Sequence, residues 1–178
     1  MYMQKTRSFL ISTLIILICS SQKPATGTGN LQWISLEQAR IRMEKEKRPI
    51  LIDLYTDWCG WCREMDKKTY ANPRVAEYLS SRFYTVRLNA ETRENISWNN
   101  KEYHFNPGYR SNEFAVFLTN GRLQFPTTVF LPTDGSAPQA VPGFFPPRDF
   151  ELIVRYFGDK AYGSIPFDVY RQQFKPSW

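Results

Sequence analysis

Apolar residues follow two different spacings along this chain, one typical of strands and one typical of helices. Continuous or alternating apolar runs predict strands at 50–55, 83–89, 127–131 and 139–141. Apolar residues three or four positions apart predict helices at 36–46, 59–69, from 73 onward, and at 111–120, 147–157 and 167–174. Strands and helices alternate in the first half, so the pattern predicts an α/β domain with a parallel pair of strands.

Capping and turn residues support several of these boundaries. Ser35 and Gln38 have the spacing of a capping box, and Asn72-Pro73 places an N-cap before a proline in the first helical position. Gly121 and Gly158 follow predicted helices as end signals. The segment 96–105 alternates on both sides of Asn99-Asn100, a pair that tolerates positive φ, so it predicts a β-hairpin with His104 on its surface.

The first thirty residues have the pattern of an export signal. Lys5 and Arg7 precede the apolar stretch Phe9–Ile18, which is ten residues long. That is too short to span a membrane, which takes about 20 residues, but it suits a signal peptide. A buried core element is the alternative, and the basic flank and N-terminal position count against it.

Cys19 lies directly after this apolar stretch. It resembles the lipid-modified cysteine of bacterial lipoproteins, with 16–18 as the lipobox, although Ile18 stands where a small residue is usual. Ordinary cleavage after Ser21 is the competing interpretation. We therefore expect a signal peptide at 1–19, a tether at 20–30 and one domain at 31–178, exported to the periplasm or cell envelope and lipid-anchored.

The charge pattern argues against a nucleic-acid partner. The chain has 23 basic and 17 acidic residues, a formal net charge of +6, and loss of Lys5 and Arg7 with the leader reduces it to +4. Basic and acidic residues are interleaved, and no basic stripe is present. We interpret these charges as a solvated surface.

The most informative motif is Trp58-Cys59-Gly60-Trp61-Cys62, directly after the strand predicted at 50–55. Two residues between the cysteines let the sulfurs meet, and a helix start at Cys59 lowers the pKa of its thiol. Because the thiolate performs disulfide exchange, the motif in this setting indicates a redox-active dithiol.

Two plainer interpretations of the cysteine pair are possible. A closed zinc site needs about four ligands, and beyond this pair the chain offers only Cys19 and His104. The pair could also be a permanent structural disulfide. Neither explains the strand-then-helix setting as well as a dithiol, so we expect no metal and no cofactor beyond the Cys59–Cys62 disulfide.

From about Trp33 to Gly158 the chain resembles the thioredoxin-fold family, and in particular its secreted bacterial thiol:disulfide interchange group. The resemblance rests on the cysteine motif, on Asp53 six residues before Cys59, and on Phe125-Pro126-Thr127-Thr128 ahead of an apolar strand. It implies a central mixed sheet flanked by helices, with the 96–105 hairpin inserted before the half that contains Pro126. Trp61, where thioredoxin has proline, and this hairpin depart from the family pattern.

The motif and the resemblance together assign roles to three residues. Cys59 is expected to face solvent and to attack a substrate disulfide, and Cys62 to resolve the mixed disulfide. Asp53 is the single charge in an apolar strand, and burial raises a carboxyl pKa, so it suits a base for Cys62. Asp53 could instead be a structural partner of a cation such as Arg87.

Five further residues are expected to contact substrate. The resemblance implies that Pro126 is cis and faces the disulfide, exposing the Phe125 backbone to an extended substrate; a trans proline before an edge strand is the alternative. Trp58 precedes Cys59, and Gly60 and Trp61 lie between the two cysteines. The two indole rings suit an apolar contact surface, although Trp58 could also pack in the core.

We therefore expect an exported thiol–disulfide oxidoreductase that reduces disulfides of envelope proteins and receives electrons from a membrane thiol reductase. Two other functions compete with this one. The first is a disulfide oxidase or isomerase, since reduction potentials of such proteins span about −270 to −120 mV. The second is a non-catalytic thioredoxin scaffold that binds a client or Cu(I), with Met65 as the nearest methionine.

Overall fold

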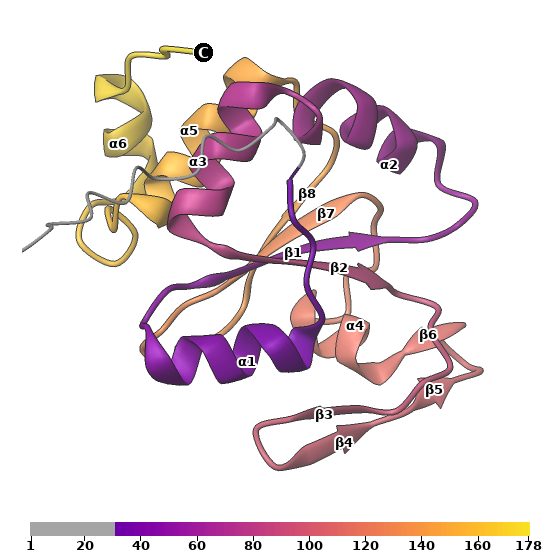
Figure 1. Ribbon diagram of the computed structural model, residues 1–178. Helices are drawn as coiled ribbons and strands as arrows, with labels where there is room; N and C mark the ends of the chain where they lie inside the picture. Colours follow the sequence, from indigo (N-terminus) through magenta and orange to yellow (C-terminus); the bar gives the residue numbers. More distant parts are fainter. Residues whose placement is uncertain (1–30) are drawn as a thin grey trace, which may run out of the picture.

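The computed structural model describes residues 31–178, which form a central four-stranded sheet covered by helices on both faces (Figure 1). The strand order is β2-β1-β7-β8, with β1 and β2 parallel and β7 and β8 antiparallel to their neighbours. The strands are β1 (Ile50–Tyr55), β2 (Tyr84–Asn89), β7 (Thr127–Leu131) and β8 (Gln139–Pro142). This is the mixed α/β sheet predicted from the sequence.

Helices α2, α3 and α5 lie on one face of the sheet, and α1 and α4 lie on the other (Figure 1). Their bounds are α1 (Leu36–Lys45), α2 (Gly60–Met65), α3 (Pro73–Arg82), α4 (Glu113–Leu118) and α5 (Pro147–Gly158). The predicted caps of α1 and α3 are present, since Ser35 and Gln38 form a capping box and the Asn72 side chain accepts from Arg74 and Val75 N–H. The cysteine motif, which directly follows β1, is thus held among strands covered on both faces and helices with capped starts.

Apart from Asp53, the residues of the central strand β1 are apolar or aromatic, because both of its faces are covered. Ile50 and Ile52 belong to the cluster under α1 and α4, whereas Leu51 packs with residues of α3 and α5. Asp53 continues the alternation onto the face of Leu51. Asp53 is therefore buried, with 1% of its surface exposed, because it points to the same covered face as Leu51.

The predicted helix 59–69 is not a single α-helix. After α2 the chain continues as a π-helical turn, Asp66–Tyr70, in which Ala71 N–H donates to the Asp66 carbonyl. Such wider turns are often found at functional sites. Here the turn coincides with side-chain contacts of Asp66 and Tyr70 that reach the buried end of β1.

The predicted helix 111–120 is wrong at its start. Ser111–Asn112 instead forms a short strand, β6, paired with β5 (Phe105–Asn106), and α4 begins at Glu113. Asn112 is held extended because its N–H donates to the Ala90 carbonyl, while its side chain caps Phe114 N–H. Gly121 is not the C′ residue: α4 has Thr119 as its C-cap, so C′ is Asn120, at φ +48°, and the N–H of Gly121 donates to the Val116 carbonyl one position later.

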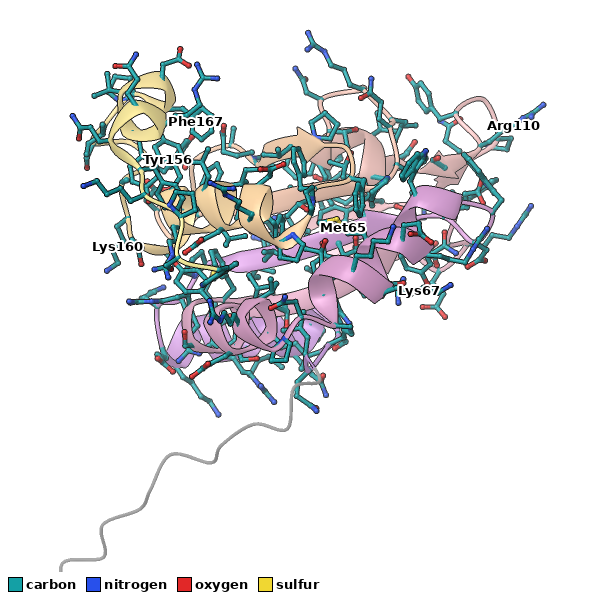
Figure 2. All side chains as sticks on the ribbon, turned by 90° about the horizontal axis from the view of Figure 1, so that it is seen from above. Met65, Lys67, Arg110, Tyr156, Lys160 and Phe167 are labelled. Carbon is teal, nitrogen blue, oxygen red and sulfur yellow. A yellow bond between two sulfur atoms is a disulfide. The ribbon has the colours of Figure 1, made fainter. Side chains whose placement is uncertain are left out.

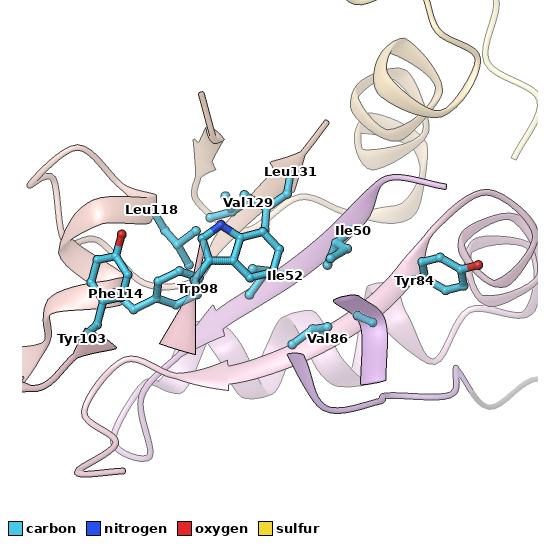
Figure 3. Close-up of a cluster of buried hydrophobic side chains, with 11 residues drawn as sticks. Ile50, Ile52, Tyr84, Val86, Trp98, Tyr103, Phe114, Leu118, Val129 and Leu131 are labelled. Carbon is cyan, nitrogen blue, oxygen red and sulfur yellow. The ribbon is translucent and has the colours of Figure 1, made fainter. Parts of the chain in front are cut away.

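The predicted hairpin consists of β3 (Ile96–Trp98) and β4 (Lys101–Tyr103), joined by Asn99 and Asn100 at positive φ. Its Trp98 and Tyr103 rings pack 6.0 and 5.1 Å from the Phe114 ring, so one face of the insertion completes the core beside α4 (Figure 3). His104 is exposed next to the hairpin, as expected.

A short helix α6 (Phe167–Gln173) packs beside α5, and the chain then returns to the α3–α5 side of the domain (Figure 1). None of the helices within residues 31–178 is long and apolar enough to cross a membrane. The expected signal peptide, Cys19 lipid site and tether lie outside the described residues.

Candidate functional site

The two cysteines of the motif are joined at the start of α2. A disulfide links Cys59 and Cys62, whose Cα atoms are 5.3 Å apart. Cys59 is the N-cap of α2, and its Sγ accepts the N–H of Cys62 at 3.0 Å. A sulfur in this position is close to unpaired backbone N–H groups that favour a thiolate once the disulfide opens.

The expectation that Cys59 faces solvent is wrong for this disulfide form. Cys59 is 4% exposed and Cys62 2%, so the two are almost equally buried. The bond to Cys62 and the hydrogen bond from its N–H hold the Cys59 sulfur inside the turn. The residues around the motif, and not the sulfurs, form its outer surface.

Asp53 lies in a chain of charges that runs through Arg87 to Asp66. The Nε of Arg87 is 3.3 Å from Asp53 Oδ2, while its Nη2 donates to Asp66 Oδ2. The guanidinium also lies 4.5 Å from the ring centroid of Tyr55. The expected alternative of an Asp53–Arg87 pair is therefore present, and Asp66 shares the same cation.

Burial raises the pKa of Asp53 to about 7, because the ionised form loses its hydration. Arg87 opposes this shift and Asp66 adds to it. Tyr70 contributes only a long hydrogen bond, 3.4 Å from its hydroxyl to Asp53 Oδ1. A carboxyl of this pKa exchanges its proton near neutral pH.

This end of the sheet is also where hydrogen bonding is incomplete. Within residues 31–178 the buried side-chain polar atoms without a hydrogen-bond partner are Thr56 Oγ1 and Arg87 Nε. Thr56 is part of the turn before the cysteines, where its carbonyl accepts Cys59 N–H at 3.2 Å. Unsatisfied buried groups cost stability, and their concentration here indicates a site shaped by something other than stability.

The peptide bond between Phe125 and Pro126 is cis, as expected. β7 begins one residue later, and Thr127 lies opposite Leu54 near the end of β1. The cis bond therefore lies at the same end of the sheet as the cysteine motif, which follows β1. Neither the N–H nor the C=O of Phe125 has a hydrogen-bond partner among residues 31–178. A free donor and acceptor are therefore available beside the motif.

Aromatic pairs stand on both sides of the disulfide. Trp58 is 66% and Trp61 62% exposed, so the alternative of a core position for Trp58 is excluded. The Trp58 ring meets Phe125 edge-on with centroids 6.0 Å apart, and Trp61 lies 5.6 Å from Phe144. Gly60 between them is exposed. An apolar surface thus surrounds the cysteine turn.

Sequence reasoning missed three residues of this site. Asp66 carried no signal because an acidic residue in a helix is normally solvated, and only the π-turn brings it to Arg87. Glu91 accepts the indole N–H of Trp58 at 2.9 Å, and Phe144 lies more than 80 residues from its partner Trp61 in the chain. Within the described residues no three His, Cys, Asp or Glu side chains are grouped to hold a metal ion.

The sequence matches the family model described as thioredoxin-like over residues 32–132, more than half of the chain. This region includes the cysteine motif, Asp53 and the cis-proline. The match is therefore to the part of the domain that builds the site.

Curated relatives share the same region. The chain is 27% identical over 144 residues to the thiol:disulfide interchange protein DsbD of Pectobacterium atrosepticum, a match covering 75% of this chain and 22% of the relative. It is 31% identical over 122 residues to DsbD of Escherichia coli K12, covering 67% of this chain and 18% of the relative. The match thus spans about a fifth of the length of these relatives.

Solved structures agree with the fold. The DsbH oxidoreductase superposes with a TM-score of 0.52 at 17% identity, covering 76% of this chain and 90% of that one. A thioredoxin from Thermus thermophilus gives 0.52 at 20% identity, covering 76% and 96%. The chain therefore belongs to the thioredoxin-like family, and its Cys59–Cys62 pair has the CxxC form of a thiol:disulfide oxidoreductase.

Proposed function

We propose that this protein is an exported thiol–disulfide oxidoreductase that reduces disulfides of envelope proteins with its Cys59–Cys62 dithiol. The observation that carries the proposal is that the Cys59–Cys62 disulfide, the cis Phe125–Pro126 bond and the buried Asp53 lie at one end of the sheet. A structural disulfide needs neither a neutral-pH carboxyl behind it nor a free backbone segment beside it.

The reaction transfers two electrons from the dithiol to a substrate disulfide. The Cys59 thiolate attacks one substrate sulfur, forming a mixed disulfide and releasing the other substrate sulfur as a thiolate that takes up a proton. Cys62 then loses its proton and attacks Cys59 Sγ. The second substrate thiol leaves reduced, and the Cys59–Cys62 disulfide of the present structure remains.

Asp53 serves the second step. Its pKa of about 7 lets the ionised carboxylate accept a proton from Cys62, directly or through a water, and release it at neutral pH. Asp53 lies on the face of β1 that α2 covers, which is the face of Met65 in the helix that carries Cys62. Arg87 and Asp66 set how readily that proton is held.

The substrate binds as an extended segment. The free N–H and C=O of Phe125 pair with its backbone, in the manner of an added strand, while Trp58 and Trp61 contact its apolar side chains. Each reduction of a substrate leaves Cys59 and Cys62 joined as a disulfide, so the protein needs a dithiol that reduces it again. We assign this role to a membrane thiol reductase. Relatives named as thiol:disulfide interchange proteins support this class of partner.

Export and anchoring form the second part of the proposal. The apolar stretch 9–18 directs export, and lipid on Cys19 holds the domain at a membrane with 20–30 as a tether. Mass spectrometry of the mature protein tests this directly. A lipid-modified Cys19 at the N-terminus supports the anchor, and an unmodified N-terminus near Gln22 refutes it while leaving export in place.

Insulin reduction with dithiothreitol tests the activity. The wild-type protein should accelerate it, and Cys59→Ser should not, because no nucleophile remains. Cys62→Ala should trap substrate proteins on Cys59 as mixed disulfides, since the resolving thiol is gone. Absence of both activity and adducts would leave only a non-catalytic binding domain.

The reduction potential, measured by equilibration with glutathione, tests the direction. A value near the thioredoxin end of the range, about −270 mV, supports a reductase. A value near about −120 mV would make the protein an oxidase.

A further inference from the structure

A groove of about 590 Å³ opens beside Trp58, and Trp61 is not among its lining residues. It is lined by Trp58 and Phe125, an aromatic pair of the site, and by Tyr109 and Arg110 of the loop between β5 and β6. The remaining lining residues are Glu91, Ser111, Leu123 and Gln124. The loop between β5 and β6, which follows the inserted hairpin, therefore lines a groove next to the cysteine motif.

Tyr109 gives this groove a second exposed ring. It is 57% exposed, and together with Trp58 and Trp61 it is one of the three most exposed large apolar side chains among residues 31–178. Trp58 and Tyr109 line the same groove, and Trp61 belongs to the same cysteine motif as Trp58. Exposed aromatic groups concentrated in one place indicate a binding surface more than chance exposure.

Arg110 supplies the charge. Its side chain is exposed and forms no ion pair within the described part of the chain, and Figure 2 shows it on a loop at the edge of the molecule. Its φ is +52°, a left-handed conformation that asparagine or glycine adopts at lower cost. The loop thus holds an arginine where the backbone favours a smaller residue.

Glu91 is the opposing charge in the groove, and it already has a partner. Its Oε1 accepts the indole N–H of Trp58, which holds that ring as a wall of the groove. The Arg110 guanidinium is accordingly the charged group of the groove whose donors have no hydrogen-bond partner among residues 31–178.

We propose that Tyr109 and Arg110 form a specificity subsite for an acidic residue that flanks the reacting cysteine of an extended polypeptide substrate. This inference rests on the proposed function and identifies its substrate class. Phe125 belongs both to the backbone that pairs with substrate and to the wall of the groove, so a segment bound there continues toward Arg110. The Tyr109 ring covers the aliphatic part of the acidic residue, and the guanidinium binds its carboxylate.

The test uses two disulfide-bonded peptides that differ only in the residue beside the cysteine, glutamate in one and lysine in the other. Wild type should reduce the glutamate peptide with a kcat/KM about 2- to 5-fold higher, the size expected of an exposed charge pair. Arg110→Asn suits the positive φ and should abolish the preference, and Arg110→Glu should reverse it. Lys101→Glu, the same charge change on the neighbouring hairpin but outside the groove, should leave the preference intact.

Salt and insulin provide the remaining readouts. The preference should disappear near 1 M salt, where the Debye length is about 3 Å. Equal rates for both peptides, or a wild-type preference for the lysine peptide, would overturn the subsite while insulin reduction continues. If the wild-type protein does not reduce insulin, the proposed function itself is overturned.

Discussion

Two carboxylates are buried among residues 31–178, one in the sheet and one in a helix that covers it, and their surroundings are opposite in kind. Asp53 in β1 is 1% exposed and Glu151 in α5 is 0% exposed. Asp53 has a long hydrogen bond from Tyr70 and an Arg87 contact without hydrogen-bond geometry. Glu151 accepts four hydrogen bonds, from Arg155 at 2.9 Å, from Ser177 N–H at 2.7 Å, from Trp178 N–H at 2.9 Å and from the Ser177 hydroxyl.

Three of the four hydrogen bonds to Glu151 come from a segment far away in the chain, and the fourth comes from Arg155 on the same helix. Ser177 and Trp178 return to the α3–α5 side, where the Trp178 ring packs 5.5 Å from Tyr78 and the Arg155 guanidinium lies over both rings. The carboxylate therefore holds the last residues of the described chain against two helices. Its role is structural.

The pKa values of the two groups follow this difference. Burial raises the pKa of Asp53 to about 7 because its partners do not replace the lost hydration. Burial also acts on Glu151, but the hydrogen bonds from Ser177 and Trp178 outweigh it and lower its pKa. Burial alone does not make a carboxyl reactive; burial without enough donors does.

Removing the Asp53 charge should produce the largest effect. Asp53→Asn should slow resolution of the mixed disulfide about tenfold or more, because the base is lost. It should also stabilise the fold at pH 8 by roughly 2–4 kcal/mol, since the native state no longer holds a poorly solvated anion. Stopped-flow thiol exchange and urea unfolding from pH 4 to 8 measure both.

The sign of this pH dependence is specific. A raised native pKa means that Asp53 favours the fold below its unfolded pKa of about 4 and loses that contribution as pH rises to about 7. The variant and wild type should therefore be closest in stability near pH 4 and diverge toward pH 7. An equal difference at every pH would assign Asp53 a packing role only.

Glu151→Ala should have the opposite consequences. It leaves Arg155 and the N–H groups of Ser177 and Trp178 without their acceptor, and we expect a loss of roughly 2–4 kcal/mol at pH 7. Because the native pKa is lowered, the difference should shrink as pH falls below about 4. Urea unfolding measures the stability, and insulin reduction by the folded protein should be unchanged.

Glu151→Gln is the matched control, because it keeps the shape and one acceptor oxygen but removes the charge. Its stability should lie between those of wild type and Glu151→Ala. A slower reduction rate in either folded variant would show that the α5 side is coupled to the cysteine site.

Asp66→Asn should produce the smallest effect and sharpen the comparison at Asp53. Removing this charge leaves Arg87 to pair with Asp53 alone, so the pKa of Asp53 should fall by a fraction of a unit. The midpoint of the pH–rate profile for resolution should move down with it, while the plateau rate stays the same. Glu64→Gln, two residues earlier in the chain and paired with Lys68, is the control and should leave the midpoint in place.

Much of the fold could be predicted because local patterns and tertiary packing agree. The β1 run, the Asn72 cap and the Asn99-Asn100 turn each depend on neighbouring residues, and each lies where expected. The predicted start of α4 was wrong because Asn112 forms a hydrogen bond with Ala90, more than 20 residues away. The π-turn at Asp66 was missed for the same reason, since its contact with Arg87 crosses from helix to sheet.

Local patterns were enough to recognise the cysteine pair, the acid in an apolar strand and the Phe125–Pro126 segment in the sequence. Which of the two buried carboxyls has a raised pKa depends on the fold, because distant segments supply the hydrogen-bond donors. Ser177 and Trp178 reach Glu151, whereas Asp53 receives a cation that it shares with Asp66. The position of Arg110 in one groove with Trp58 is likewise a product of the fold, because the loop between β5 and β6 lies about 50 residues from Trp58 in the chain.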